Sequence, residues 1–206
     1  MKPRIPERFH SQRLEYERIG PDHAAPLTAL LRDPRVMRTL WPWSTVPGDD
    51  QIRSSLDGKI HHWERHGFGM WALFDRNREF VGRGGLQYTD VLGTRVIEVG
   101  WAIVPERWGQ GLATELALTS VEIAFSRLDV REVIAFTLPD NVASRRVMEK
   151  AGFAYEREIV HAGLPHVVYR RRAPANAAPP NAGTANAAPA NAAPTATLTH
   201  TSRPPL

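Results

Sequence analysis

The pattern of apolar and polar positions changes its period several times along the chain, and these changes predict its elements. Alternating or continuous apolar runs predict about seven strands, at 13–19, 70–74, 79–88, 96–104, 132–138, 153–159 and 164–171. Apolar residues three to four apart predict about four helices, at 27–31, 52–66, 112–128 and 144–151. The aromatic, proline-broken segment 36–43 fits neither pattern. The order of elements predicts a mixed α/β fold.

Composition divides the chain into three parts. From Ala173 onward it is nearly all Ala, Pro, Asn and Thr, with Asn at 176, 181, 186 and 191, and Arg203 is its only formal charge. A tract with so few large apolar side chains does not bury a core, so 173–206 is predicted to be a disordered tail. The prediction is therefore an N-terminal extension at 1–10, a single domain at 11–172, and this tail.

The turn after the strand at 96–104 is the strongest functional signal. Pro105 ends the strand, Gly109 and Gly111 follow, and a helical pattern begins at Leu112. A strand, a glycine-bearing turn and a helix start direct several backbone N–H groups and a helix dipole to one place, which favours phosphate binding. The alternative is an ordinary tight connection between a strand and a helix.

Two motifs together resemble the GCN5-related N-acetyltransferases (GNAT), and most closely the bacterial ribosomal-protein N-terminal acetyltransferase (RimJ/RimL-like) group. They are Trp108-Gly-Gln-Gly-Leu-Ala113 and Asn141-Val-Ala-Ser-Arg-Arg-Val-Met-Glu-Lys-Ala-Gly-Phe153. The resemblance covers about 11–172. It implies the acyl-CoA N-acyltransferase fold, with the fourth and fifth strands (96–104 and 132–138) splayed apart to admit the pantetheine arm of acetyl-CoA.

The resemblance also implies which residues bind the coenzyme. Trp108 occupies a slot that is Gln or Arg in the family pattern, Gly111 the glycine and Ala113 the final small position. The backbone of Gly109, Gln110, Gly111, Leu112, Ala113 and Thr114 is expected to hold the pyrophosphate, and that of Ile103 and Val104 to pair with pantetheine. Asn141 is expected to bond backbone or pantetheine amides, with an Asx turn as the alternative. For the glycine turn, the alternative role is helix capping.

Transfer of an acetyl group to an amine needs a neutral amine, and Glu98 is the candidate base. It lies between the apolar Ile97 and Val99, where partial desolvation raises the pKa of a carboxylate. The alternatives are a surface glutamate or a structural ion pair. Relatives often place a tyrosine as general acid in the short helix at 144–151, where this chain has Met148. Ser144 is therefore the candidate acid, with an N-cap as its alternative role.

Aromatic and histidine residues provide weaker signals. Trp41, Trp43 and Trp101 are candidates for the acceptor pocket, and core packing is the alternative. His62 and His66 have i, i+4 spacing beside His61, but no third ligand accompanies them. A solvated or substrate-lining face is favoured over a zinc site, and no metal is expected.

Charge and cysteine content narrow the function classes. The net charge is +4, and without Arg203 of the tail it is +3, with basic residues scattered among acids. Nucleic-acid binding is therefore not expected. The absence of cysteine excludes a disulfide framework and a cysteine acyl-enzyme. No apolar run is long enough to span a membrane, so a cytoplasmic location is expected. The oligomeric state expected is a monomer or a homodimer.

The sequence thus predicts an acetyl-CoA-dependent N-acetyltransferase that acetylates a primary amine, at a protein N-terminus or on a small molecule, by direct attack in a ternary complex. Met148 favours an alternative, a coenzyme-binding module whose catalysis has lapsed and which serves sensing or assembly. A nucleic-acid adaptor built on the arginine clusters at 145–146 and 170–172 is the weaker third hypothesis.

Overall fold

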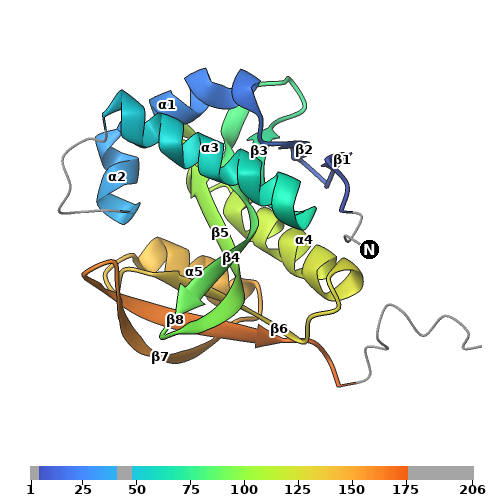
Figure 1. Ribbon diagram of the computed structural model, residues 1–206, viewed down its shortest axis with the longest axis vertical. Helices are drawn as coiled ribbons and strands as arrows, with labels where there is room; N and C mark the ends of the chain where they lie inside the picture. The colour runs from blue at the N-terminus through green and yellow to red at the C-terminus, as the bar shows by residue number, and fades with distance from the viewer. Residues whose placement is uncertain (1–4, 41–47, 176–206) are drawn as a thin grey trace, which may run out of the picture.

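The computed structural model describes residues 5–40 and 48–175, which form one eight-stranded sheet with five α-helices (Figure 1). The strands are β1 (Arg8–His10), β2 (Glu15–Arg18), β3 (Met70–Phe74), β4 (Phe80–Val91), β5 (Thr94–Ile103), β6 (Glu132–Thr137), β7 (Ala154–His161) and β8 (Leu164–Arg172). The α-helices are α1 (Ala24–Arg32), α2 (Pro34–Leu40), α3 (Asp49–His66), α4 (Leu112–Arg127) and α5 (Val142–Lys150). Two 3-10 turns, η1 (Pro21–His23) and η2 (Pro105–Arg107), precede α1 and α4.

The strand order in the sheet is β1-β2-β3-β4-β5-β6-β8-β7. β4 and β5 pair along the whole of β5, whereas β5 and β6 are parallel and meet at one register pair, Glu98 and Ile134. All other neighbours are antiparallel. The two strands therefore part just beyond Glu98, which confirms the predicted splay between the fourth and fifth predicted strands.

Helices cover both faces of the sheet. α4 packs against β4 and β5 so closely that a Cβ on Gly84 would lie 2.3 Å from Leu116 Cδ2. Glycine at this position is what allows the helix to approach the strand. On the other face, buried Leu27 of α1 and Leu56 of α3 pack with Ala102 of β5 in one apolar cluster. Figure 1 shows α1 and α3 at the top of the view and α5 with β6–β8 in the lower part.

The structure adds two short elements to the predicted ones. β1 lies inside the predicted N-terminal extension, and its Phe9 pairs with Tyr16 of β2, the rings stacking at 4.2 Å. Three residues are too few to show a period, so the pattern missed this strand. α2 occupies most of the segment 36–43, because Pro34 starts a helix that buries Val36 and Met37.

Three further features complete the fold. The glycine-rich stretch 82–85 lies within β4 and is not a phosphate loop. Gly67 ends α3 in the left-handed conformation, with φ 74°. β8 ends at Arg172, the predicted end of the domain, and the predicted disordered tail lies almost wholly outside the described residues. In the described part of the chain, no helix combines the length and apolar character needed to cross a bilayer.

Candidate functional site

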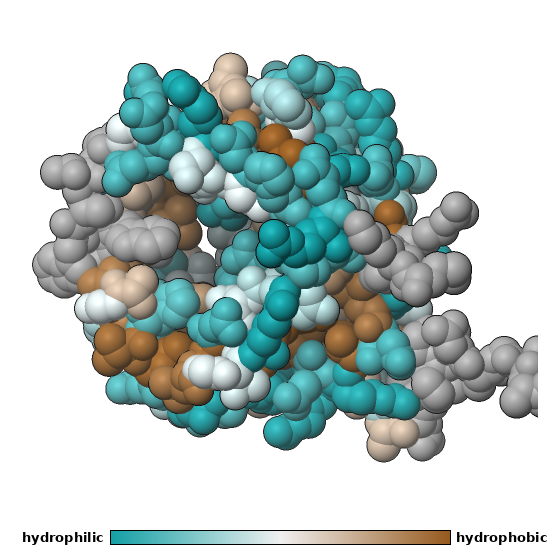
Figure 2. All heavy atoms as spheres, viewed as in Figure 1, coloured by the Kyte–Doolittle hydropathy of each residue, from teal (hydrophilic) through white to brown (hydrophobic). Residues whose placement is uncertain are grey.

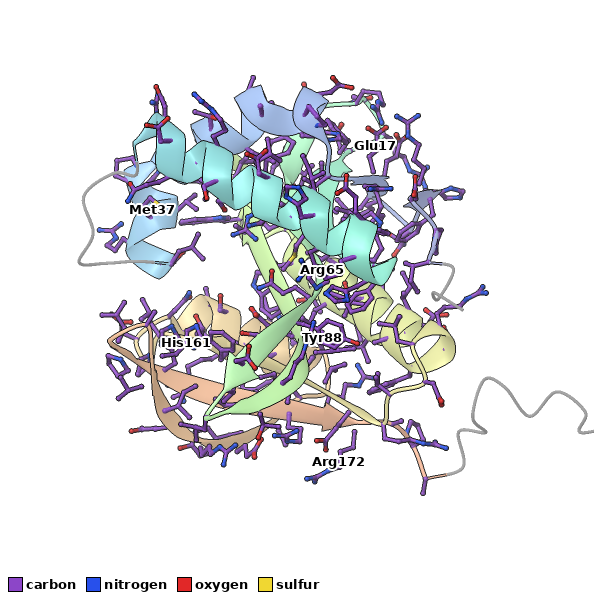
Figure 3. All side chains as sticks on the ribbon, in the orientation of Figure 1. Glu17, Met37, Arg65, Tyr88, His161 and Arg172 are labelled. Carbon is purple, nitrogen blue, oxygen red and sulfur yellow. The ribbon has the colours of Figure 1, made fainter. Side chains whose placement is uncertain are left out.

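The parting of β5 and β6 opens a cavity of about 510 Å³. Its walls come from β5, the start of α4, α5, and the turn between β7 and β8. Figure 2 shows this face of the molecule hollowed between the upper helices and the lower strands. In Figure 3, His161 lies on the lower side of the opening and Met37 on the upper side.

The glycine turn forms one wall of this cavity. Gly109 and Gly111 both have left-handed backbone, with φ 74° and 77°, which other residues adopt only under strain. Gly111 is the N-cap of α4, and the first intrahelical bond runs from the N–H of Glu115 to Gly111 O at 3.1 Å. The N–H groups of residues 112–114 precede that bond, so the helix supplies them with no acceptor. This arrangement fits a phosphate or diphosphate group.

A distant side chain holds the turn in place. Arg13 Nη1 donates to Gln110 O at 2.7 Å, and Arg13 Nε pairs with Glu115 Oε2 at 2.7 Å. Ser11 Oγ donates to the same carboxylate, to Glu115 Oε1, at 2.6 Å. The segment before β2 therefore holds the turn through the C=O of Gln110 and the carboxylate of Glu115.

Eight of the ten residues expected to bind the coenzyme line the cavity: Ile103, Trp108, Gly109, Gly111, Leu112, Ala113, Thr114 and Asn141. Gln110 is not among the lining residues, since its side chain turns back to donate to Glu106 O at 3.3 Å. Val104 also lies outside the lining. Their proximity makes the eight candidates for coenzyme binding, and their role stays a prediction.

The backbone groups of Val104 already have partners within the protein. Its N–H donates to Val81 O at 2.9 Å, and its C=O accepts from Arg107 N–H at 2.9 Å, so the structure gives no support to pairing of Val104 with pantetheine, which stays a prediction. Successive residues of a strand turn their backbone groups to opposite edges, so Ile103 and Trp101 turn theirs toward the open edge of β5. Of these groups, Ile103 O already accepts from Trp108 Nε1 at 2.7 Å. The Ile103 N–H and the N–H and C=O of Trp101 would therefore be the backbone groups available to a pantetheine arm.

Glu98 lies where the strands part, and its half-buried side chain lines the cavity. Burial raises the pKa of its carboxyl, as predicted, and the opposing influences are the Gln87 hydrogen bond and the charges of Arg83, His161 and Lys59. Gln87 Nε2 donates to Glu98 Oε2 at 2.8 Å. No ion pair involves Glu98 in the described part of the chain, so the surface and ion-pair alternatives lose their support. A carboxylate with a raised pKa inside a cavity suits a general base.

Asn141 and Ser144 both lie at the start of α5 and have different roles there. Asn141 Oδ1 accepts the N–H of Ser144 at 3.1 Å, so Asn141 is the N-cap, and the alternative role for Ser144 is wrong. Asn141 Nδ2 also donates to Thr137 Oγ1 at 3.0 Å. The Ser144 side chain lines the cavity, whereas Met148 is 1% exposed and belongs to the core. Position 148 therefore does not face the cavity.

Trp101 lines the cavity from β5, whereas Trp41 and Trp43 lie outside the described residues. The sequence interpretation missed several polar residues of the cavity lining, among them Arg83, Gln87, His161 and His166. Alternation along the predicted strand 79–88 places Arg83 and Gln87 on one face and would have found them. His161 and His166 lie beside the β7–β8 turn and gave no such signal.

His62 of α3 has two structural partners. His62 Nδ1 donates to Phe68 O at 2.8 Å, and His62 Nε2 accepts from Tyr88 N–H at 3.0 Å. Both ring nitrogens are thus used, so His62 is not available as a metal ligand. No cluster of three metal-binding side chains occurs among residues 5–40 and 48–175.

Comparisons with known proteins agree with this geometry. The sequence model of the acetyltransferase (GNAT) domain matches residues 13–154. The FsC-acetyl coenzyme A-N(2)-transacetylase of Aspergillus fumigatus is 32% identical over 159 residues, which are 71% of this chain and 65% of that protein. This chain thus spans just under two thirds of that relative.

Solved structures share the fold. An acetyltransferase from Agrobacterium tumefaciens superposes with a TM-score of 0.69 at 19% identity, covering 82% of this chain and 95% of that one. RimL, the ribosomal L7/L12 alpha-N-protein acetyltransferase in complex with coenzyme A, superposes with a TM-score of 0.64 at 22% identity, covering 82% and 97%.

Proposed function

This chain belongs to the GNAT family of acetyl-CoA-dependent N-acetyltransferases, and from that premise we propose that it acetylates a primary amine by direct attack in a ternary complex. The acceptor is a protein N-terminus or a small-molecule amine. Glu98 is the base, and Ser144 is the proton donor to the leaving thiolate.

One observation carries the proposal. The N–H groups of residues 112–114 and the half-buried carboxylate of Glu98 belong to the walls of one continuous cavity. A diphosphate at the start of α4 and an amine at Glu98 would therefore share that cavity, which is what a ternary complex requires. The two left-handed glycines leave the turn without side chains that would obstruct a ligand.

The residues of the chain then have separate tasks. Acetyl-CoA supplies the thioester carbonyl. An alkyl ammonium has a pKa of about 10, so near pH 7 it must lose a proton before its nitrogen can attack. Glu98 accepts that proton, and its raised pKa brings it nearer to that of the amine. The Ser144 hydroxyl lies on the α5 side of the cavity, where it can donate a proton to sulfur as the C–S bond breaks and the C–N bond of the amide forms. The second proton that the nitrogen loses then restores the hydroxyl.

The test is free-thiol release from acetyl-CoA with a panel of small amines and N-terminal peptides. Turnover that depends on an added amine supports the proposal. Direct attack predicts intersecting initial-velocity lines when both substrates are varied, and parallel lines would contradict it.

A second candidate function is a coenzyme-binding module without turnover. With Met148 in the core, the helix position where relatives often have a tyrosine supplies no proton donor to the cavity, and this observation favours the alternative. Tight binding of coenzyme A with no thiol release across the whole panel would support this alternative and overturn the first.

A further inference from the structure

A second, smaller cavity of about 210 Å³ lies between α1, α3 and β4. Two half-buried cations line it: Lys59 from α3 and Arg83 from β4. Arg83 also lines the large cavity that contains Glu98, so its side chain borders both.

Among the described residues, 5–40 and 48–175, the Arg83 guanidinium has no anionic partner. Its Nε is buried without a hydrogen-bond acceptor, as judged over residues 5–40 and 48–175. Every Asp and Glu of the chain falls within those ranges, because 1–4, 41–47 and 176–206 contain no acidic side chain. None of them forms an ion pair with Arg83, and the Glu98 charge acts on it only from a distance. A buried charge without a partner is costly, so such an arginine indicates a missing anion.

Lys59, which lines the same cavity as Arg83, also lacks an anionic partner among the described residues. Lys59 Nζ donates to Ser55 Oγ at 3.0 Å and to Ser55 O at 3.4 Å, both on its own helix. Burial and the repulsion from Arg83 lower the pKa of Lys59 to about 7. An anionic group between the two cations would offset that repulsion.

The register of the sheet relates this pair to Glu98. Arg83 lies opposite Ala102, and Gln87 lies opposite Glu98, so the two positions on β5 are four residues apart, or about 13 Å. Side chains two and four residues apart share a face, which places Arg83, Gln87 and Glu98 on the face that α1 and α3 cover. The glycine turn leads into α4, which packs on the opposite face against Gly84. The two cations therefore lie apart from the expected diphosphate position.

We propose that Arg83 and Lys59 bind a carboxylate or phosphate of the acceptor, so that the acceptor is an anionic amine whose amino group reaches Glu98. The inference rests on the proposed acetyl transfer and narrows its substrate class. A guanidinium and an ammonium both bind carboxylate and phosphate, and the separation along β5 favours acceptors whose two groups are several bonds apart.

Matched pairs of acceptors test this directly. 6-Aminohexanoate is compared with hexylamine, and phosphoethanolamine with ethanolamine, by thiol release at saturating acetyl-CoA. The anionic member of at least one pair should have the lower KM, by about 10-fold or more, because charge-assisted hydrogen bonds to a desolvated anion are strong. The pair that shows the preference identifies the anion as carboxylate or phosphate.

Three variants and a control show whether Arg83 and Lys59 cause the preference. Arg83→Gln should reduce the KM preference to about one, and Arg83→Lys should retain part of it. Lys59→Gln provides an independent variant should Arg83→Gln fail to fold. Arg65→Gln removes the same charge from an exposed position of α3, outside both cavities, and should keep the preference (Figure 3). Loss of the preference in Arg65→Gln would mean a long-range charge effect and overturn the inference.

Calorimetric binding of the same four compounds, in the presence of coenzyme A, separates the two proposals. Equal turnover of neutral and anionic amines overturns the anion site and leaves the proposed function in place. Absence of turnover with every amine overturns the proposed function, and the calorimetry then decides the anion site. In that case, the anion site is supported if an anionic compound binds and Arg83→Gln abolishes its binding. The anion site is overturned if both members of each pair bind equally or do not bind.

Discussion

The two sides of the cavity are built in different ways. The side at the start of α4 consists of backbone from one short stretch, with two glycines and the N–H groups of a helix start. The side at α1 and α3 consists of side chains: Glu98 and Arg83 line it, and Lys59 lies in the smaller cavity that Arg83 also borders. Backbone groups are the same in every sequence, so such a site keeps binding one constant ligand. Side chains change with each substitution, so the other side can set which acceptor is used.

Substitutions on the two sides should therefore act through different physical effects. On the α4 side, a change matters when it fills the space or strains the turn. On the α1 and α3 side, a change matters through charge and proton affinity. Changes on the α4 side should mainly weaken coenzyme binding, and changes on the α1 and α3 side should mainly alter turnover and the choice of acceptor.

Gly111→Glu should break the backbone side most severely. The new side chain places a carboxylate at the N-terminus of α4 and strains a residue with φ 77°, so coenzyme A binding should weaken at least about 100-fold. Calorimetry with coenzyme A measures the Kd. Gly93→Glu is the matched control, since Gly93 also has φ 77° with open space around it, in the turn between β4 and β5. Unchanged binding by Gly111→Glu would show that the turn is not the coenzyme site.

Glu98→Gln should slow turnover near pH 7 by about 100-fold, the size typical of a lost general base. Because burial raises the pKa of Glu98, the wild-type rate should fall in acid at a higher pH than for an ordinary glutamate. The deficit of the variant should shrink toward pH 10, since the amine there is neutral without help. A pH–rate profile measures both effects.

Glu122→Gln on the exposed surface of α4 serves as the control for this change and should leave the profile as in the wild type. A deficit of Glu98→Gln that stays constant from pH 6 to about pH 10 would exclude Glu98 as the base.

Ser144→Ala should have a smaller effect, lowering kcat about 10-fold while KM for the coenzyme changes little. The N-cap belongs to Asn141, so the substitution leaves the start of α5 intact and tests the hydroxyl alone. Steady-state kinetics measure the effect, with Ser126→Ala on the exposed side of α4 as the control. A kcat equal to wild type would remove Ser144 from the mechanism.

Truncation after Ala175 should have the smallest effect. The cut retains the bond from the N–H of Ala173 to Arg131 O at 2.8 Å and removes only the predicted disordered tail. Calorimetric Tm should stay within about 1 °C of the full chain, as for changes away from packed structure. A large drop in Tm or in kcat/KM would show that the tail contributes to the domain.

The backbone side was predictable from sequence because its signals are local. Pro105, Gly109 and Gly111 specify a strand end and a left-handed turn within a few residues, and the structure has them so. Glu98 was also predictable, since its apolar neighbours imply burial. The backbone partners of Val104 were not predictable, because which edge a backbone group faces depends on the register between β5 and β4.

The side-chain side was only partly predictable. Arg83 and Gln87 share a face of β4 by simple alternation, but the cavity beside Lys59 exists only when α3 packs across that face. Similarly, β1 forms because the fold presents β2 as its partner, and no three-residue segment specifies that alone. Contacts between distant segments are what the hydrophobic pattern does not encode.

A crystal structure of the protein with coenzyme A would show directly whether the turn at 109–114 holds the diphosphate. We expect diphosphate oxygens about 2.9 Å from backbone nitrogens between residues 109 and 114, with the pantetheine arm entering between β5 and β6. A coenzyme bound elsewhere, with that turn making no contact to phosphate, would contradict this expectation.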